Sequence, residues 1–309
     1  MLDPYFKAML DAAAEAGGPS IESLGPVGAR EFYRGLSLDG DDTYPDVAMR
    51  DLMVAGGAGP MKARLYTPKS APTPGGGLVY YHGGGWVIGD LETHDKLCRN
   101  LASTGGFRVL AVDYRLAPEA PFPASYDDAV AAANWAFDHA AEIGFDPAKV
   151  AVGGDSAGGN LAAAVAIALR DAGEHKLAFQ LLLYPVTQVD RTTGSLRDLA
   201  EGYFLTKAGM DWFGDCLFAG GGDRGDPRVS VLNAQDHSGL APAFVATAGY
   251  DPLKDEGRQY AEKLKAAGVK TEHRHYPAFI HGYCQMAGLS PDAAAAVKEA
   301  AAMVQAALS

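Results

Sequence analysis

The sequence contains little cysteine, and its cysteines do not form a recognisable pattern. There are three cysteines, Cys98, Cys216 and Cys284, which is an odd number. They are widely spaced, and no Cys-x-x-Cys pair occurs. Disulfide frameworks and zinc ribbons need regularly spaced pairs, so we expect neither of them. A reducing compartment fits this cysteine usage best, and we predict a cytoplasmic protein.

Long apolar segments are also missing. The first ten residues, MLDPYFKAML, contain an early aspartate and an early proline and do not resemble a secretory signal. No stretch of about 18 uninterrupted apolar residues occurs. We therefore expect no membrane span.

Positive charge is scarce. Lysine and arginine together number 26 against 38 aspartates and glutamates, which gives a formal net charge of -12, and no basic stripe offsets it locally. Because a phosphate backbone would be repelled by this charge, we do not expect a nucleic-acid partner.

The composition is otherwise that of an ordinary globular protein, and its elements alternate regularly. Hydrophobic residues make up 48% and charged residues 21% of the 309 residues. Short apolar runs predict strands at 61–65, 78–81, 108–112, 150–153, 179–184, 242–247 and 269–276. Helical spacing predicts helices at 126–139, 160–172 and 255–267, and a closing helix from 290 onward. This alternation predicts an α/β fold, with a mostly parallel central sheet covered by helices on both faces.

Two regions do not follow this alternation. Residues 1 to about 45 begin with apolar side chains at helical spacing, and the segment Gly17–Ser20 interrupts that helix. Residues 188–238 form a long interval that is rich in aromatic residues and glycine. We interpret the second region as an insertion that packs with the N-terminal helices.

The strongest chemical motif is Gly-Asp-Ser-Ala-Gly at 154–158, between a predicted strand and a predicted helix. This is the context of a nucleophile elbow, in which a sharp turn exposes the hydroxyl of Ser156 at the end of the sheet. Glycines on either side let the neighbouring backbones approach closely. The N–H of Ala157 could then donate a hydrogen bond to an oxyanion.

The same glycines could instead belong to a phosphate-binding loop. Gly153 and Gly158 stand at the required spacing, but Gly159 and Asn160 occupy the positions where that motif needs Lys and Ser or Thr. The nucleophile elbow is therefore the better interpretation.

A second motif, His-Gly-Gly-Gly-Trp at 82–86, directly follows the apolar run that ends at Tyr81. Three consecutive glycines leave their backbone N–H groups accessible and remove side chains from the region where negative charge develops. This element supplies further donors to an oxyanion hole. The alternative is a flexible surface loop.

A nucleophilic serine needs a base and an acid that orients it, in the chain order Ser, Asp or Glu, His. His281 follows the last predicted strand, so its loop can reach Ser156. His273 and His275 lie within that strand, without a third ligand for a metal, and we expect structural or surface roles for them. Asp251 follows the preceding strand and is the best acid, while the nearby acids at 255–256 open a helix and favour its dipole.

These residues resemble the hormone-sensitive-lipase-like group of α/β-hydrolases, which includes bacterial carboxylesterases. Five segments carry the resemblance in the family's order: His82–Trp86, Asp113–Glu119, Gly154–Asn160, Asp251–Gly257 and Phe279–Gly282. The resemblance implies that Ser156 is the nucleophile, Asp251 the acid and His281 the base. The oxyanion donors carry over to Gly84, Gly85 and Ala157.

The resemblance also implies a mostly helical cap. With the two irregular regions, it suggests a cap formed by residues 1–45 and 188–238 and a catalytic α/β-hydrolase domain formed by 46–187 and 239–309. For the substrate pocket we name Trp86, Tyr184 and Leu205. By analogy with the family alone, a homodimer is plausible.

The function expected from these residues is hydrolysis of short to medium acyl esters through an acyl-enzyme, acting on a small-molecule ester without metal or organic cofactor. The same triad could instead cleave an amide, a lactone or a carbamate. The fold of this family also occurs in small-molecule receptors. The resemblance implies that such receptors have lost the catalytic histidine. The presence of His281 argues against that last alternative.

Overall fold

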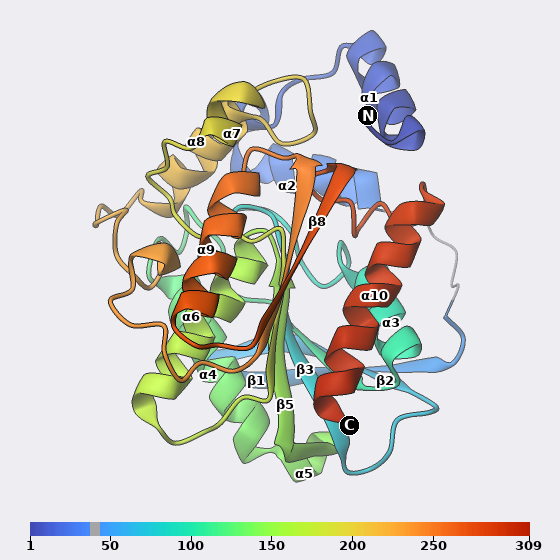
Figure 1. Cartoon of the computed structure of the whole chain (residues 1–309), viewed down its shortest axis with the longest axis vertical. Coiled ribbons are helices and arrows are strands. Elements are labelled where there is room, and N and C mark those ends of the chain that lie inside the picture. Colours follow the sequence, from blue (N-terminus) through green and yellow to red (C-terminus); the bar gives the residue numbers. More distant parts are fainter. Residues whose placement is uncertain (38–43) are drawn as a thin grey trace.

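The computed structural model describes residues 1–37 and 44–309. In this part of the chain eight strands form one sheet, in the order β1-β2-β4-β3-β5-β6-β7-β8 (Figure 1). The strands are β1 (Val47–Gly56), β2 (Gly59–Pro68), β3 (Gly75–Tyr81), β4 (Arg108–Val112), β5 (Phe145–Asp155), β6 (Phe179–Leu183), β7 (Ala243–Tyr250) and β8 (Thr271–Ile280).

The sheet is parallel except at one edge. Strands β3 to β8 pair in parallel, whereas β1 pairs with β2 and β2 pairs with β4 in antiparallel fashion. The chain runs from β3 outward to β4 and then returns to the other side of β3 as β5. Ligands of α/β sheets bind at such reversals, beyond the carboxyl ends of the strands.

Helices cover both faces of the sheet. Figure 1 shows α4, α6 and α9 on one face and α3 and α10 on the other. The helices are α1 (Pro4–Ala16), α2 (Gly25–Ser37), α3 (Asp95–Gly105), α4 (Ala124–Asp138), α5 (Ala140–Ile143), α6 (Ala157–Ala172), α7 (Gly194–Asp198), α8 (Lys207–Leu217), α9 (Lys254–Ala266) and α10 (Pro291–Leu308). Short 3₁₀ helices occupy η1 (Ile21–Leu24) and η2 (Val231–Asn233).

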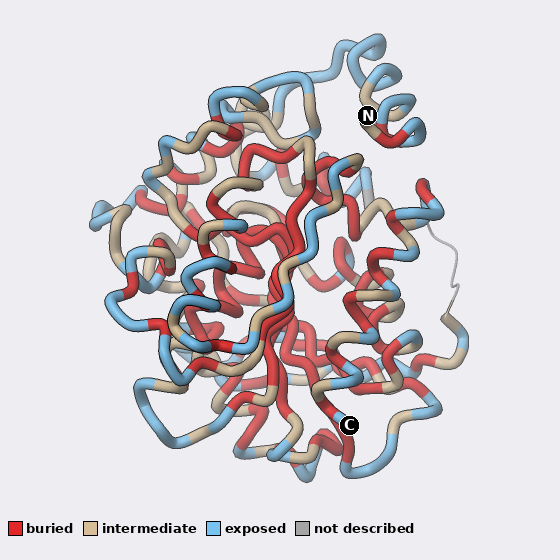
Figure 2. The backbone as a smooth tube through the Cα atoms, in the orientation of Figure 1, coloured by how far each residue is buried: buried red, intermediate tan, exposed pale blue. Residues whose placement is uncertain are grey.

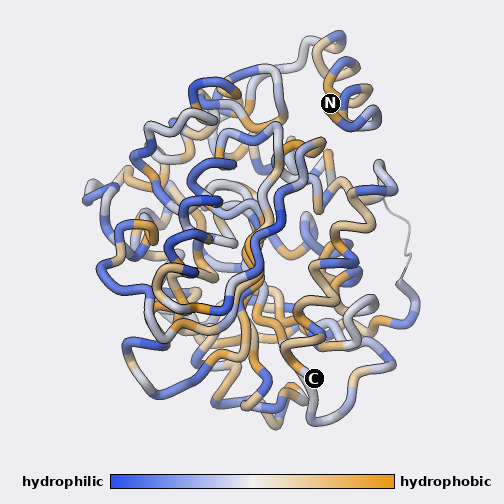
Figure 3. Tube along the Cα trace, viewed as in Figure 1, coloured by the Kyte–Doolittle hydropathy of each residue, from blue (hydrophilic) through white to orange (hydrophobic). Residues whose placement is uncertain are grey.

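Two hydrophobic cores lie on opposite faces of the sheet, because successive side chains of a strand point to opposite sides. On β3, Val79 and Tyr81 pack in the core under α4, α6 and α9, while Leu78 and Tyr80 pack in the core under α3 and α10. Strands β3, β4 and β6 are buried along their whole length and are mostly apolar (Figures 2 and 3). Burial on both faces explains why these strands appear in the sequence as continuous apolar runs.

The predicted fold class is confirmed, although several elements were not predicted. Strand β1 was not predicted, because most of its side chains are exposed and show no alternation of apolar and polar residues. Helix α3 was not predicted either, although its buried face includes Leu97, Cys98 and Leu101. Among the described residues, no helix is both long enough and apolar enough to cross a membrane.

The two irregular regions meet beyond the carboxyl ends of the strands. Helices α1, α2, α7 and α8 lie above the sheet in Figure 1, and η1 packs against α8. The division into a cap and a catalytic domain stays a prediction. Residues 38–43 of the range 1–45 lie outside the described residues.

Candidate active site

Ser156 lies in the turn between β5 and α6, where the backbone is strained. Its φ of 53° is positive, which L-residues rarely adopt. A Cβ atom on Gly158 would lie 1.8 Å from the carbonyl oxygen of Tyr81, and one on Gly154 would lie 2.4 Å from backbone atoms of Gly158. Only glycine fits at these two positions, so the sharp turn depends directly on the sequence motif.

Ser156, His281 and Asp251 lie within hydrogen-bonding distance of one another, although they are far apart in the sequence. The distance from Ser156 Oγ to His281 Nε2 is 2.9 Å, and that from His281 Nδ1 to Asp251 Oδ2 is 2.8 Å. His281 follows β8 and Asp251 follows β7, so neighbouring parallel strands bring both to the same edge of the sheet as Ser156. This geometry allows the imidazole to take the serine proton while Asp251 holds its other nitrogen.

Asp251 is fully buried and fixed by its own loop. Its second carboxylate oxygen, Oδ1, accepts a hydrogen bond from the N–H of Leu253 at 2.8 Å. With both oxygens occupied, the carboxylate cannot rotate freely, and the imidazole it holds has a defined orientation.

The glycine loop after β3 lies beside Ser156. Gly84 and Gly85 have positive φ angles of 117° and 59°, and a Cβ on Gly85 would meet the ring of Phe213 at 2.3 Å. Within 1–37 and 44–309, the N–H groups of Gly84, Gly85 and Ala157 have no hydrogen-bond partner. Donors left free beside a nucleophile can stabilise a developing oxyanion.

A buried polar network holds this loop from behind, and the sequence motifs did not reveal it. The N–H of Gly83 donates to Asp155 Oδ1 at 3.0 Å and to His94 Nε2 at 3.2 Å. Gln285 contacts His94 and donates to Asp155 Oδ2 at 3.2 Å. Tyr33 of α2 donates to Gln285 Oε1 at 2.5 Å. Helix α2 is thus connected through side chains to the glycine loop beside Ser156.

The charge of Asp155 is maintained inside this network. Burial raises the pKa of Asp155, but the facing His94 and the hydrogen bond from Tyr80 outweigh burial and lower the pKa overall. Asp155 is therefore ionised and accepts several hydrogen bonds at once.

His82 is buried next to the network and is neutral at physiological pH. Burial, followed by the nearby His94, lowers its pKa to about 4. The ring stacks on Tyr114 at a centroid distance of 4.2 Å, and Nδ1 lies 2.7 Å from the carbonyl oxygen of Gly83. His82 thus fixes the start of the glycine loop by packing and by one hydrogen bond.

Ser156 and His281 open into a cavity of about 420 Å³. Its wall is mainly apolar and includes Met9, Leu10, Phe32, Leu36, Gly84, Gly85, Trp86, Val186, Leu205, Met210, Phe213 and Leu253. The cavity is formed by both irregular regions together with the loops at the ends of the strands.

Of the three pocket residues named from the sequence, Trp86 and Leu205 line this cavity and Tyr184 does not. The side chain of Tyr184 is buried in the core on the α3 and α10 side, with its ring 4.9 Å from that of His281. The reason is local, since Tyr184 directly follows β6 and has a positive φ of 36°.

His273 and His275 lie apart from this site. Both rings contact Thr247 Oγ1, at 3.0 Å and 3.1 Å. Among the described residues, no group of three or more His, Cys, Asp or Glu side chains is arranged to hold a metal ion.

Comparisons with known proteins show the family to which the chain belongs. Residues 78–285 match the family model described as alpha/beta hydrolase fold. "Carboxylic ester hydrolase LipN" of Mycobacterium tuberculosis is 42% identical over 322 residues, covering 100% of this chain and 84% of the relative. "Carboxylesterase NlhH" of the same organism is 43% identical over 316 residues, covering 99% and 96%. A solved structure, the ester hydrolase EH1AB1 from the metagenome of Lake Arreo, has a TM-score of 0.94 at 46% identity, covering 99% of each chain.

Proposed function

Because the chain belongs to the alpha/beta hydrolase fold family, in its hormone-sensitive-lipase-like group, and is a carboxylic ester hydrolase, we propose that Ser156, His281 and Asp251 are its catalytic triad. One observation carries the proposal. The serine hydroxyl, both imidazole nitrogens and the buried carboxylate form one chain of contacts of 2.9 Å and 2.8 Å that ends at the cavity.

The first half of the reaction transfers the acyl group to the enzyme. His281 Nε2 accepts the proton of Ser156 as Oγ bonds to the ester carbonyl carbon, and the carbonyl electrons move onto oxygen. The N–H groups of Gly84, Gly85 and Ala157 donate to this oxyanion, and each donor of this kind contributes about 3 kcal/mol to transition-state stabilisation. When the tetrahedral intermediate collapses, His281 returns the proton to the leaving alcohol and the acyl group stays on Ser156.

The second half releases the acid. His281 takes a proton from water as the water oxygen attacks the acyl carbon, and a second tetrahedral intermediate forms in the same oxyanion hole. Its collapse breaks the bond to Ser156 Oγ, which recovers its proton from His281. In both halves Asp251 keeps the imidazole oriented and stabilises its positive charge.

We propose that the substrates are esters with short to medium acyl chains. The volume of the cavity, about 420 Å³, falls in the lower part of the roughly 300–1,000 Å³ range of small-molecule sites. We further propose that residues 1–45 and 188–238 act as a cap on this cavity. A cytoplasmic location is supported by the three cysteines, all free, and a homodimer by analogy with the family.

The test is hydrolysis of p-nitrophenyl acetate, butyrate, octanoate and palmitate by the wild type and by Ser156→Ala. We expect turnover of butyrate or octanoate, slow turnover of palmitate, and a loss of about 10⁴ to 10⁶ in kcat in the variant. The exposed Ser238 provides a matched control, because Ser238→Ala removes a hydroxyl that contacts only a neighbouring aspartate. Full activity in Ser156→Ala would refute the triad assignment.

A further inference from the structure

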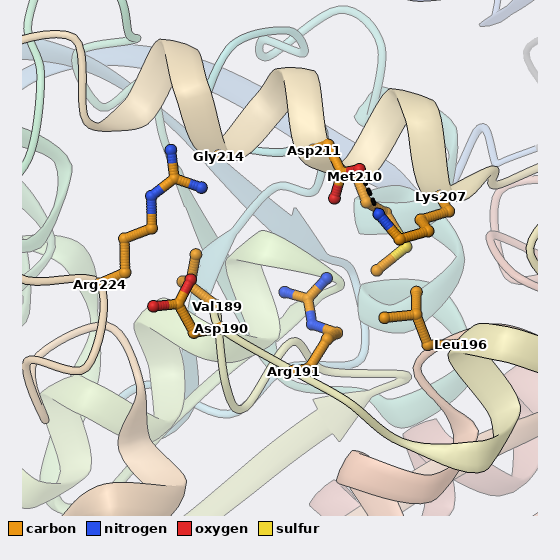
Figure 4. Close-up of a pocket in the computed structure, with 9 residues that line it drawn as sticks. All are labelled: Val189, Asp190, Arg191, Leu196, Lys207, Met210, Asp211, Gly214 and Arg224. Atoms are coloured by element: carbon orange, nitrogen blue, oxygen red, sulfur yellow. Dashed lines mark hydrogen bonds and ion pairs between the residues drawn. The ribbon is translucent and has the colours of Figure 1, made fainter.

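A second, smaller cavity of about 110 Å³ lies between the start of the 188–238 insertion and helix α8 (Figure 4). It is lined by Val189, Asp190, Arg191, Leu196, Lys207, Met210, Asp211, Gly214 and Arg224. Two of these residues, Arg191 and Met210, also line the large cavity that contains Ser156. The two cavities are therefore neighbours that share a wall.

Arg191 places a buried cation in that wall. Its side chain is only 8% exposed, and Figure 4 shows its guanidinium group in the middle of the small cavity, with both terminal nitrogens directed toward α8. The Nε–H donates to the carbonyl oxygen of Gln188 at 2.7 Å. Nη1 and Nη2 have no hydrogen-bond partner anywhere in 1–37 or 44–309.

The carboxylate closest to Arg191 does not use these terminal nitrogens. Glu256 Oε2 lies 2.8 Å from Arg191 Nε, but that N–H is aimed at Gln188, so the contact is an ion pair rather than a hydrogen bond. The other oxygen of Glu256 accepts from the N–H groups of Thr187 and Gln188. Burial raises the pKa of Glu256 to about 7 even though Arg191 lowers it. Glu256 is therefore a weak counter-ion for Arg191.

The other charged groups of the small cavity have partners on the surface or are exposed. Lys207 forms an ion pair with Asp211, Arg224 pairs with Asp215 at 2.6 Å, and Asp190 is exposed. Arg191 thus differs from them, because it is buried and borders an apolar cavity. A guanidinium group presents donors in a planar fork that matches the two oxygens of a carboxyl group.

We propose that Arg191 binds a second carboxyl group of the ester substrate, so that the protein prefers esters carrying such a group to simple alkyl esters of the same length. This inference rests on the proposed function, because it concerns a substrate held in the cavity of Ser156. The second carboxyl group can be a free carboxylate or an ester, since both present carboxyl oxygens to the fork. A carboxylate gains more from the cation, because its hydrogen bonds are charge-assisted.

The experiment compares matched substrates that carry the second group on either side of the scissile bond. On the acyl side these are p-nitrophenyl hexanoate, mono-p-nitrophenyl adipate and its methyl ester. On the alcohol side they are hexyl acetate, 6-acetoxyhexanoate and its methyl ester. For each protein the kcat/KM of the carboxyl-bearing ester is divided by that of the alkyl ester, so that a general loss of activity cancels.

The variants are Arg191→Lys and the double substitution Arg191→Met with Glu256→Gln, which avoids leaving the buried Glu256 without its partner. The matched control is Arg258→Met, because Arg258 lies on the same helix as Glu256 but is exposed and pairs with Glu262. We expect the wild type to favour the carboxyl-bearing ester on one side. The double variant should lower that ratio about ten- to a hundredfold, and Arg191→Lys should lower it less. Arg258→Met should keep the wild-type ratio.

The outcomes separate this inference from the proposed function. If the wild type hydrolyses p-nitrophenyl hexanoate but the ratio is the same in the double variant on both sides, the role of Arg191 is refuted and the esterase function stands. If the wild type hydrolyses none of the esters, the proposed function fails and this inference fails with it. If the wild type prefers the methyl esters to the free acids, Arg191 binds the second carboxyl group as a neutral ester and not as a carboxylate.

Discussion

Tyr81 and Gly154 are register partners on the adjacent strands β3 and β5. This pairing places the ends of the two strands side by side, so the glycine loop that follows Tyr81 and the serine that follows Gly154 emerge at the same point. The carbonyl oxygen of Tyr81 also limits how closely the first turn of α6 can approach the end of β3. The position of Ser156 relative to the N–H groups of Gly84 and Gly85 is therefore a consequence of sheet register.

Gly158→Ala tests this close approach. The new Cβ would lie 1.8 Å from the carbonyl oxygen of Tyr81, which is backbone and cannot rotate away, so α6 must move. Overpacking of this kind costs about 1–3 kcal/mol or more, and we expect that loss in urea unfolding together with a large fall in kcat. Gly35→Ala on α2 is the control, since among the described residues no atom outside the adjoining turns of α2 lies within 4 Å of its Cβ position. Equal stability of the two variants would contradict the packing argument.

Asp251→Asn tests the role of the buried carboxylate. The amide keeps the shape of the side chain but cannot accept from His281 Nδ1 with its nitrogen, and it favours the wrong imidazole tautomer. We expect a fall of about 10⁴ in kcat, with KM and the thermal midpoint changed much less. Steady-state kinetics with p-nitrophenyl butyrate measures it. A variant that retains a tenth of the wild-type kcat would show that another group orients the imidazole.

Gln285→Leu tests the network behind the glycine loop. The substitution removes the hydrogen bonds to Asp155 and Tyr33 but keeps the volume of the side chain. Because the glycine loop becomes less well fixed, we expect kcat to fall about tenfold with little change in KM. This fall corresponds to an activation free energy that is higher by roughly 1–1.5 kcal/mol. Tyr33→Phe, which loses only one of these bonds, should show a smaller effect of the same kind. A change confined to KM would contradict a role in fixing the loop.

The stability of the protein should fall in acid because of His82. Its pKa is lowered from 6.5 to about 4 in the folded protein, so the unfolded chain binds a proton more readily between these two values. Folding stability from this residue is thus fully present above pH 6.5 and is lost as the pH falls through 4. The difference corresponds to about 3 kcal/mol.

Urea unfolding of the wild type and of His82→Asn at pH 7 and pH 4.5 measures this dependence. Asparagine can still donate to the carbonyl oxygen of Gly83 but does not titrate. The variant should lose less stability between the two pH values than the wild type. Identical slopes would show that His82 is not the group responsible.

The sequence predicted the parts of the fold and of the site that depend on local patterns. The central strands could be predicted because they are buried on both faces and leave continuous apolar runs, whereas the exposed β1 leaves none. The segments around Ser156 and Gly84 could be located because a sharp turn and a close approach of backbones require glycine at fixed positions. His281 and Asp251 could be named because chain order and strand ends restrict the choice.

The rest could not be predicted because it depends on contacts between distant segments. Tyr33, His94 and Gln285 meet only after α2, the loop before α3 and the loop after β8 have packed together. Arg191 lies in an insertion without a motif, and its burial is a property of the packed structure. Tyr184 was placed in the pocket because an apolar strand end does not reveal which face a side chain will take. A polar residue between apolar neighbours, such as Gln285 between Cys284 and Met286, is the one signal that could have suggested the network.

The contact between Tyr33 and Gln285 has a consequence for protein engineering. An exchange of the first 37 residues for those of a relative, made to alter substrate range, would also replace one support of the glycine loop that follows β3. We therefore expect substrate selectivity and turnover to change together, and a grafted N-terminal segment would have to bring a hydroxyl group to the amide of Gln285. Libraries that vary α2 should therefore keep Tyr33 fixed.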